Sequence, residues 1–291
     1  TCALPISTIT QRMERALVSD LDIYLFDLRG YLVLEDALTA AEVDELNACL
    51  DDIPKLAPGE WHGYVAGHSY GDVTSGVNYQ QIYEAGEPFE KLIDHPSWYE
   101  KVKHFVGGQA TFDSHHGPLF IDECFANFRE PGEAIGIHSG GHHTVKRNQY
   151  RVRNGRFMCG QVNILLALTD IGPGDGGTML IPGSHKQNFP HPHERDHTMR
   201  QGASVDGIDA AIEVYLKKGD AALFVDTLAH GSAKRVNEGT RRVAVYRYGP
   251  SWGNFRHGYE ASPDLLARLT PERCRVVQPQ QLLPREPQVA R

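Results

Sequence analysis

The chain has 291 residues, of which 41% are hydrophobic and 23% charged, as in an ordinary globular protein. Its formal net charge of −8 offers no basic surplus for nucleic acid, and no apolar run is long enough to cross a bilayer. The five cysteines are scattered without a C-x-x-C pair, which favours a reducing cytoplasm. Composition leaves the oligomeric state open.

The first residues, 1–7 (TCALPIS), contain no initiator Met and resemble the translation of a sequencing adapter. We therefore expect a non-native leader, a metagenome origin for the gene, and a native start at Met13. The length suits one large domain with additions. We expect a single domain over 13–291, with a mixed helical part at 13–115, a β core at 116–250 and a C-terminal extension at 251–291.

The sequence of the N-terminal third contains patterns that predict both helix and strand. Residues 30–34 form a short apolar run after a glycine, which is typical of a strand. Thr39 and Glu42 match a capping box. The apolar residues that follow at helical spacing predict an amphipathic helix whose buried face is Val43, Leu46 and Leu50.

In the next segments the sequence pattern changes from helical spacing to short apolar runs. Residues 54–76 are rich in Gly, Pro and His and predict a loop, and helical spacing returns over 89–106. After residue 116, short apolar runs alternate with Gly, Pro and Asp, which predicts an antiparallel sandwich, barrel or jelly roll. The expected strands are 119–128, 157–168, 178–181, 211–216, 221–225 and 242–248. The tail after Gln278 is expected to be loosely attached.

Four motifs in the β region carry candidate chemistry, and they follow one another in a fixed order. His138-Ser139-Gly140 comes first, and a Gly-Gly segment then leads to IPGSH at 181–185. A Gly-Asp and apolar run at 219–225 leads to His230-Gly231-Ser232, and Arg241 follows on the next strand. Together the motifs resemble the phytanoyl-CoA dioxygenase family of iron(II)- and 2-oxoglutarate-dependent oxygenases, over about residues 25 to 250.

The resemblance implies an all-β core with helical additions, folded as a double-stranded β-helix, which is a jelly-roll or cupin-like fold. It implies a catalytic domain that uses Fe(II), 2-oxoglutarate and O₂ to attack an aliphatic C–H bond of a small molecule. Iron(II) with open positions is usually held by two His and one carboxylate. The resemblance assigns the two imidazole ligands to His138 and His230.

The same resemblance assigns a clamp for 2-oxoglutarate. Arg241 would pair with the distal carboxylate, because a planar guanidinium matches a carboxylate with two hydrogen bonds. Ser232 would add a hydroxyl donor. Gln161 and Asn163 lie two positions apart on one strand face and are expected to reach the cofactor or the substrate.

One position departs from the family pattern. The family's first motif is H-x-D, and here Gly140 replaces the Asp and offers no ligand. In related radical halogenases this position is Gly or Ala and a halide fills the vacated place, so the sequence slightly favours a halogenase that also binds chloride. The alternatives are a hydroxylase whose third ligand is His142 or His143, a carboxylate approaching from Asp122 or Glu123, and a non-catalytic cupin-like binding protein.

Several neighbouring residues have structural explanations. His185 is expected to bond a turn. The histidines after Pro190 fit an exposed loop better than a zinc site: His191, His193 and His197. The basic run at 146–156 is interpreted as a solvated hairpin, with a rim for an anionic substrate as the functional alternative. Trp252 follows the Arg241 strand and is interpreted mainly as a packing residue.

Overall fold

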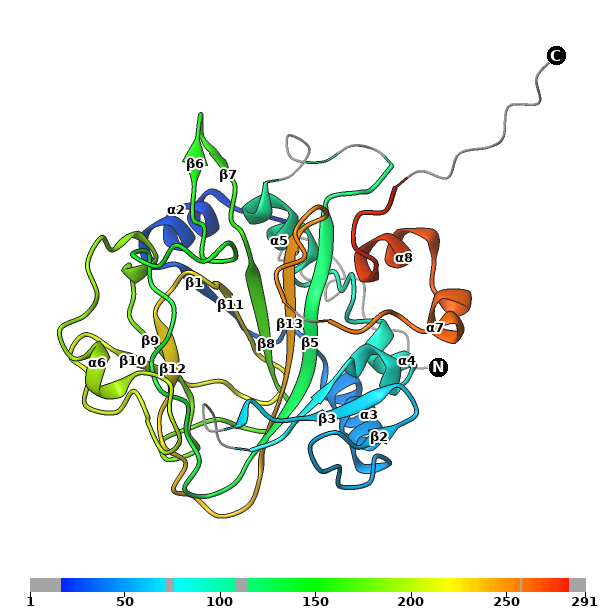
Figure 1. Ribbon diagram of the computed structural model, residues 1–291, viewed down its shortest axis with the longest axis horizontal. Helices are drawn as coiled ribbons and strands as arrows, with labels where there is room; N and C mark the ends of the chain where they lie inside the picture. The colour runs from blue at the N-terminus through cyan, green and yellow to red at the C-terminus, as the bar shows by residue number, and fades with distance from the viewer. Residues whose placement is uncertain (1–16, 72–75, 108–111, 113–114, 257, 283–291) are drawn as a thin grey trace.

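The computed structural model describes residues 17–71, 76–107, 112, 115–256 and 258–282. Two β-sheets face each other at the centre of the molecule (Figure 1). The leader expected at 1–7 and the start expected at Met13 lie outside the described residues. No helix in the described part of the chain is long and apolar enough to span a membrane.

The larger sheet has eight antiparallel strands in the order β1-β11-β8-β13-β5-β4-β3-β2. In chain order these strands are β1 (Tyr31–Leu34), β2 (Trp61–His62), β3 (Val65–His68), β4 (Asn78–Gln80), β5 (Leu119–Arg129), β8 (Val162–Ala167), β11 (Ala221–Val225) and β13 (Arg241–Pro250). Pairing of strands that are distant in sequence, such as β13 with both β5 and β8, closes one half of the double-stranded β-helix.

The smaller sheet completes the fold. Its strands run in the order β10 (Ile212–Val214), β9 (Thr178–Leu180) and β12 (His230–Ser232). A backbone bridge from His138 to His230 adds the segment around His138 to its edge. A separate hairpin of β6 (Val152–Arg153) and β7 (Arg156–Phe157) projects from the body (Figure 1). The implied jelly-roll core with helical additions is confirmed.

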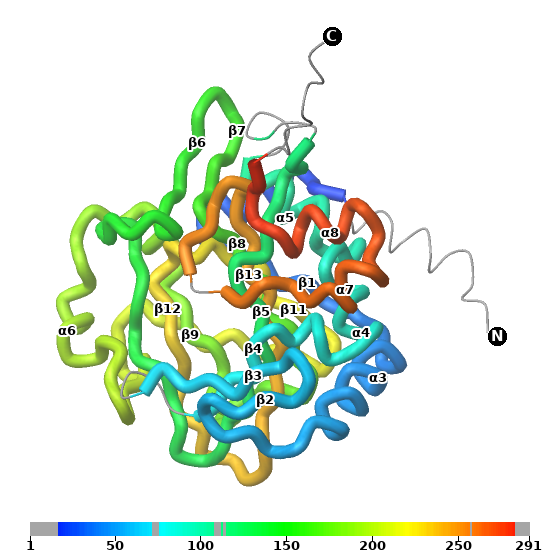
Figure 2. The backbone as a smooth tube through the Cα atoms, turned by 45° about the vertical axis from the view of Figure 1, so that its right-hand side comes forward, coloured from blue at the N-terminus to red at the C-terminus, as the bar shows by residue number. Residues whose placement is uncertain are grey.

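Short helices surround this core. They are α2 (Asp20–Arg29), α3 (Ala40–Asp51), η2 (Ile82–Ala85), α4 (Glu87–Glu90), α5 (Tyr99–Val106), η4 (Ser184–Lys186), α6 (Glu194–His197), α7 (Pro263–Arg268) and α8 (Pro271–Val277). The predicted capping box is present, since Thr39 N donates to Glu42 Oε2 (2.7 Å) and Glu42 N donates to Thr39 Oγ1 (3.2 Å). The predicted apolar face of α3 is buried. Figure 2 shows α7 and α8 returning in front of β5 and α5.

The pleat of β13 separates an outer, helix-covered face from an inner one. Tyr246 and Tyr248 point outward, where their hydroxyls donate to the carbonyls of Phe89 (2.8 Å) and Leu92 (3.0 Å). Trp98 Nε1 donates to the Tyr248 hydroxyl (3.2 Å). Because side chains alternate across a strand, the odd-numbered residues from Arg241 to Arg247 face the smaller sheet and can form a site.

The structure corrects three expectations about elements. The predicted loop at 54–76 contains β2 and β3, which are too short to show a two-residue period. The predicted helix at 89–106 is divided into α4 and α5, with Pro96 between them, because a proline disfavours helix in the residue before it. The residues before 116 supply β1 to β4 to the larger sheet, so the β core extends beyond 116–250.

Candidate functional site

A cavity of about 150 Å³ lies between the two sheets. Every second residue of β13 lines its floor: Arg241, Val243, Val245 and Arg247. The adjacent strand β5, in antiparallel register, contributes Phe125, Asn127 and Arg129. The smaller sheet and its edge contribute His138, His230 and Ser232. The structure thus brings both candidate metal ligands and both parts of the candidate clamp to one cavity.

The two histidines are held as an antiparallel pair with their rings side by side. His138 N donates to His230 O (2.9 Å), His230 N donates to His138 O (3.0 Å), and the ring centroids are 4.0 Å apart. The two Nδ1 atoms lie 3.1 Å from Gly136 O and 2.6 Å from Leu228 O. A carbonyl only accepts, so each Nδ1 carries the proton and each Nε2 keeps a lone pair for a metal.

Burial keeps both rings neutral. It lowers the pKa of His230 to about 4. Burial, and then the neighbouring charge of His230, hold the pKa of His138 well below its ordinary value. A metal binds the neutral imidazole, so the site presents both ligands in the required form at neutral pH.

No third protein ligand joins this pair in the described part of the chain. No His, Cys, Asp or Glu there forms a group with His138 and His230 whose ligand atoms all lie within 4.8 Å of one another. Glu123 is paired instead with Arg247 (3.1 Å) and Arg256 (3.3 Å). The other candidate ligands are engaged elsewhere too.

Those other candidates have clear partners. Asp122 accepts from the backbone N–H of Phe255 (3.0 Å). His142 and His143 group with Glu194, a residue that the sequence did not single out. The expectation that His142 or His143 completes the His138 site is therefore not met in this arrangement.

Gly140 has a conformation and surroundings that the sequence does not reveal. Its φ is +122°, where side chains are rarely tolerated, and an added Cβ would lie 2.6 Å from Gln187 Nε2 and 2.9 Å from the His142 ring. Gly140 N donates to Thr227 O (2.8 Å), which fixes the loop. The direction that a side chain at this position would take is therefore filled by two neighbouring side chains.

The clamp region contains two guanidinium groups, of which the sequence indicated one. Arg129 and Arg241 are direct partners across β5 and β13, and they are only 1% and 3% exposed. Arg241 Nη2 donates to Asn127 Oδ1 (3.0 Å), and Arg129 Nη1 donates to Ser232 Oγ. The sequence did not predict a role for Arg129, because only the pairing of β5 with β13 places it beside Arg241.

The carboxylates of Glu133 and Asp175 act on these two arginines without forming an ion pair with them. Among the described residues neither has a carboxylate oxygen within 4.0 Å, and the Nε atom of each has no hydrogen-bond partner. Burial lowers the pKa of Arg129 to about 10, and burial with the charge of Arg129 lowers the pKa of Arg241. Unpaired charges out of water are costly, so this end of the cavity is suited to an anion.

The opposite end of the cavity is balanced by its own carboxylates. Asp226 Oδ2 lies 2.9 Å from Arg147 Nε, and Asp226 Oδ1 lies 3.4 Å from Arg256 Nη2. Although burial alone raises the pKa of Asp226, these guanidinium groups hold it well below its ordinary value. Gln161 Oε1 accepts from Arg256 Nη2 (3.1 Å), and Asn163 Nδ2 donates to Asp226 Oδ1 (3.0 Å). Gln161 and Asn163 therefore support this network, and neither lines the cavity.

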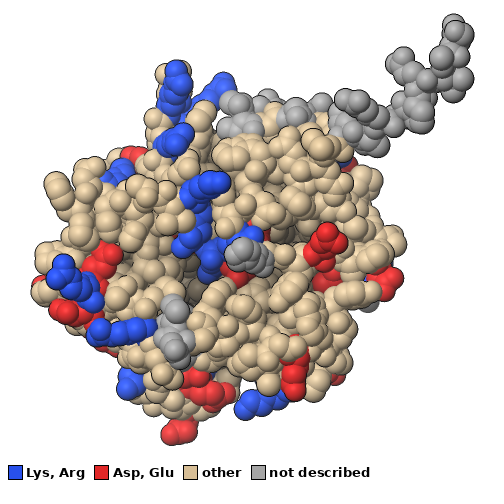
Figure 3. Space-filling view, viewed as in Figure 1, with Lys and Arg blue, Asp and Glu red and all other residues tan. Residues whose placement is uncertain are grey.

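The basic run is divided between the cavity and the surface. Arg147 lines the cavity, whereas the other basic residues of the run are exposed: Lys146, Arg151, Arg153 and Arg156. Figure 3 shows Lys and Arg side chains from the β6–β7 hairpin down to the middle of this face. His185 Nε2 donates to Asp27 O (3.0 Å), so it bonds a turn as expected. Trp252 is 55% exposed and does not line the cavity.

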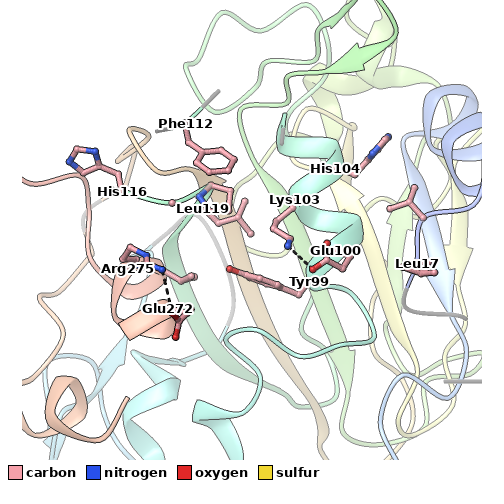
Figure 4. A pocket seen from close by; sticks show the side chains of 14 residues that line it. Leu17, Tyr99, Glu100, Lys103, His104, Phe112, His116, Leu119, Glu272 and Arg275 are labelled. Atoms are coloured by element: carbon pink, nitrogen blue, oxygen red, sulfur yellow. Dashed lines mark ion pairs between the residues drawn. The ribbon is translucent and has the colours of Figure 1, made fainter. Parts of the chain in front are cut away.

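A larger hollow of about 560 Å³ lies elsewhere, between α5 and α8 (Figure 4). Tyr99 and Leu119 face it, and the ion pairs Lys103–Glu100 and Arg275–Glu272 flank it. None of the site residues expected from the sequence lines this hollow. We therefore assign the candidate site to the smaller cavity between the sheets, where the ligating and charged groups converge.

Comparisons with known proteins give the same family that the sequence motifs resemble. A family model described as phytanoyl-CoA dioxygenase (PhyH) matches residues 26–243. The dioxygenase cdmD of Talaromyces verruculosus is 30% identical over 145 residues, which are 49% of this chain and 43% of that protein. The match thus spans less than half the length of this curated relative.

Solved structures share the fold at low identity. HygX from Streptomyces hygroscopicus, with nickel and 2-oxoglutarate bound, aligns with a TM-score of 0.66 and 23% identity over 85% of this chain and 94% of that one. SnoN, a non-heme α-ketoglutarate-dependent epimerase from nogalamycin biosynthesis, aligns with a TM-score of 0.54 and 16% identity over 83% and 84%. At such identities the likeness shows the double-stranded β-helix itself.

Proposed function

We infer the function from family and site together: the chain belongs to the phytanoyl-CoA dioxygenase family and is an enzyme of the iron- and 2-oxoglutarate-dependent dioxygenase superfamily. Family membership sets aside the reading as a non-catalytic binding protein. The proposal concerns this chain's own residues. His138 and His230 hold Fe(II), Arg241 and Arg129 hold 2-oxoglutarate, and a small molecule is oxidised at a C–H bond.

One observation carries the proposal. The two imidazoles whose Nε2 atoms are left for a metal share a single cavity with two buried guanidinium groups that form no ion pair with a described carboxylate and whose Nε atoms have no hydrogen-bond partner. A metal ion fits the first pair and a carboxylate fits the second. A 2-oxoacid with a distal carboxylate joins both ends, because one end chelates metal and the other accepts hydrogen bonds from arginine. When bound, the iron and the 2-oxoacid supply the oxidising chemistry.

The protein's part is positioning and exclusion of water. The backbone carbonyls of Gly136 and Leu228 fix both rings in the ligating tautomer. Ser232 Oγ accepts from Arg129 and from Ile135 N (2.9 Å), so its own proton remains to donate to a bound carboxylate. Phe224 packs with its edge against His230 (5.0 Å) and shields that ligand.

The substrate is proposed to be a small molecule with an anionic group. A related HygX structure contains hygromycin B, a small-molecule ligand. Arg147 and Arg256 line the cavity at the end away from Arg241. An anionic substrate group that enters here would share their N–H donors with Asp226 and Glu123. Such a group is favoured by the basic side chains gathered along this face (Figure 3).

Binding of Fe(II) and 2-oxoglutarate under anaerobic conditions tests the metal and clamp assignments. We expect a weak visible charge-transfer band when both are added to the unmutated chain. His138→Ala and His230→Ala should each abolish the band and the turnover of 2-oxoglutarate, while His191→Ala, at a partly exposed position that does not line the cavity, should keep both. A normal band in either ligand variant would remove these two residues from the metal site.

Halogenation is proposed as the second candidate, on one specific observation. No described carboxylate joins His138 and His230, so a halide bound to the metal would supply the missing negative charge, and Gln187 and His142 would have to move if it bound beside Gly140. We expect added chloride or bromide to shift the charge-transfer band before any substrate is present. A halide-insensitive band in the unmutated chain would leave oxygenation as the only reading.

A further inference from the structure

A group of metal-ligating side chains lies apart from the candidate iron site. His142, His143 and Glu194 each offer a ligand atom, and these atoms all lie within 4.8 Å of one another. His142 and Glu194 side chains are each 14% exposed, and His143 is 40% exposed. The group combines a loop after β5 with the first residue of α6, which are about fifty positions apart in the chain.

The spacing within this group is that of metal ligands. Glu194 Oε1 lies 3.5 Å from His142 Nε2 and 3.4 Å from His143 Nε2. Hydrogen bonds between nitrogen and oxygen usually measure about 2.7 to 3.2 Å. Ligands at about 2.0 to 2.1 Å from a tetrahedral Zn(II) are instead separated by roughly 3.3 to 3.4 Å. The geometry therefore matches two edges of a zinc coordination tetrahedron better than it matches ion-pair hydrogen bonds.

The carboxylate also lacks other partners. Glu194 Oε2 is buried and has no hydrogen bond. A buried carboxylate oxygen without a donor is costly, and a bound cation would remove that cost.

The ring of His142 has a neighbour that can orient it. Gln187 Nε2 lies 2.8 Å from His142 Nδ1 and, in this orientation, donates to it, which leaves the ring proton on Nε2. Rotation of the amide by half a turn presents its oxygen to Nδ1 instead. Metal binding at Nε2 therefore requires the rotated amide, which holds the proton on Nδ1.

The backbone around the histidines is fixed before any metal arrives. Gly141 N donates to Ser184 O (2.9 Å), and a Cβ at Gly141 would lie 2.7 Å from two carbonyl oxygens, so the loop is pressed against the turn at 184–187. His143 N donates to Gly140 O (3.1 Å). The two glycines thus allow the close approach that places both imidazoles opposite α6.

We propose that His142, His143 and Glu194 form a second metal site, specific for a zinc-class divalent ion and completed by water. Imidazole and carboxylate ligands in tetrahedral geometry suit Zn(II). The ion connects the loop that carries His138 to α6. Past α6, Thr198 pairs with Ile137 and Met199 lines the cavity. The zinc therefore acts as a structural clip for the wall of the catalytic cavity and takes no part in the oxidation.

The test uses the full chain carrying His138→Ala and His230→Ala, which lacks the proposed iron ligands. After dialysis against Zn(II), bound metal is measured by mass spectrometry, and affinity by competition with a chromophoric chelator. We expect one zinc per chain, and with Co(II) the absorption of a tetrahedral complex. Adding Glu194→Gln or His143→Ala should lower the affinity by more than about a hundredfold.

His193→Ala is the matched control, because His193 precedes Glu194 and is outside the group; it should retain the zinc. Hydrogen exchange at 194–199 should slow when Zn(II) binds, and this slowing should disappear in Glu194→Gln. Equal zinc content in the Glu194→Gln and control chains would overturn the proposal. So would loss of the iron and 2-oxoglutarate band in Glu194→Gln with His138 and His230 intact, because the group would then belong to the iron site. Failure of the iron assignment alone would leave the zinc result unaffected.

Discussion

At the scale of single residues, the candidate site is defined by how charge is distributed in one cavity. Glu123 and Asp226 neutralise the arginines at one end. Arg241 and Arg129 at the other end have only neutral hydrogen-bond acceptors, such as Asn127 and Ser232. A dicarboxylate is therefore expected to enter with its distal group towards the unbalanced pair.

Arg241→Ala should weaken 2-oxoglutarate binding by on the order of a hundredfold, because a charge-assisted contact worth a few kcal/mol is lost. Titration calorimetry under anaerobic conditions with Fe(II) measures the effect. Arg153→Ala, on the exposed β6–β7 hairpin, is the control and should bind normally. Equal affinity in the Arg241 variant would show that another group holds the distal carboxylate.

At the scale of elements, one histidine connects three segments. His185, in η4, donates to Asp27 O of α2. Its ring packs on Gly30, where an added Cβ would come within 2.6 Å of Nδ1. Gly30 ends α2 with φ +84° and leads into β1. The PGSH motif thus holds the N-terminal helix and first strand against the turn, which is a structural role.

His185 makes stability depend on pH. Burial lowers its pKa to about 4, against about 6.5 in the unfolded chain. Between these values the unfolded state binds more protons, so the free energy of unfolding falls as pH decreases from about 6.5 to 4, by up to roughly 3 kcal/mol. Urea unfolding across this range should show a shallower fall in His185→Gln than in the unmutated chain. Parallel curves for the two proteins would contradict this, and His191→Gln, at a partly exposed position, is the control.

The sequence correctly predicted those helices and strands whose capping or apolar pattern lies within a short stretch of the chain. The helix after Thr39 and the strands around β5, β8, β11 and β13 carry capping or apolar signals that are visible within about ten residues. β2, with two residues, and β4, with three, carry no such signal and exist because β3 and β5 pair with them.

The same division applies to the site. The residues His138, His230, Ser232 and Arg241 were found because each motif can be recognised from a few neighbouring residues. Arg129 and Glu194 were not found, since only tertiary pairing brings them to Arg241 and His142. The filled space beside Gly140 was hidden for the same reason: Gln187 is distant in the sequence.

At the scale of the whole molecule, the fold separates stability from function. A large part of the apolar core lies on the outer face of the large sheet, where Tyr246 and Trp98 are fully buried against the helices. The space between the sheets combines apolar side chains, such as Phe125 and Val243, with buried charged ones. Natural proteins commonly trade stability for such sites, and here the cost should be concentrated in the adjacent Arg129 and Arg241.

Arg129→Met should therefore stabilise the ligand-free protein while it weakens 2-oxoglutarate binding. Methionine has a similar length, fills the buried space and removes one of two like charges that lie side by side without an ion-pair partner. Replacing uncompensated buried charge by apolar packing is expected to raise the free energy of unfolding by about 1 to 3 kcal/mol. Urea denaturation of metal-free protein without 2-oxoglutarate measures this change.

In saturating 2-oxoglutarate the order of the two stabilities should reverse, because the unmutated chain gains binding free energy that the variant loses. A ligand-free Arg129→Met chain that is less stable than the unmutated one would show that the fold balances this guanidinium by contacts of its own, and the anion would then not be required at this end of the cavity.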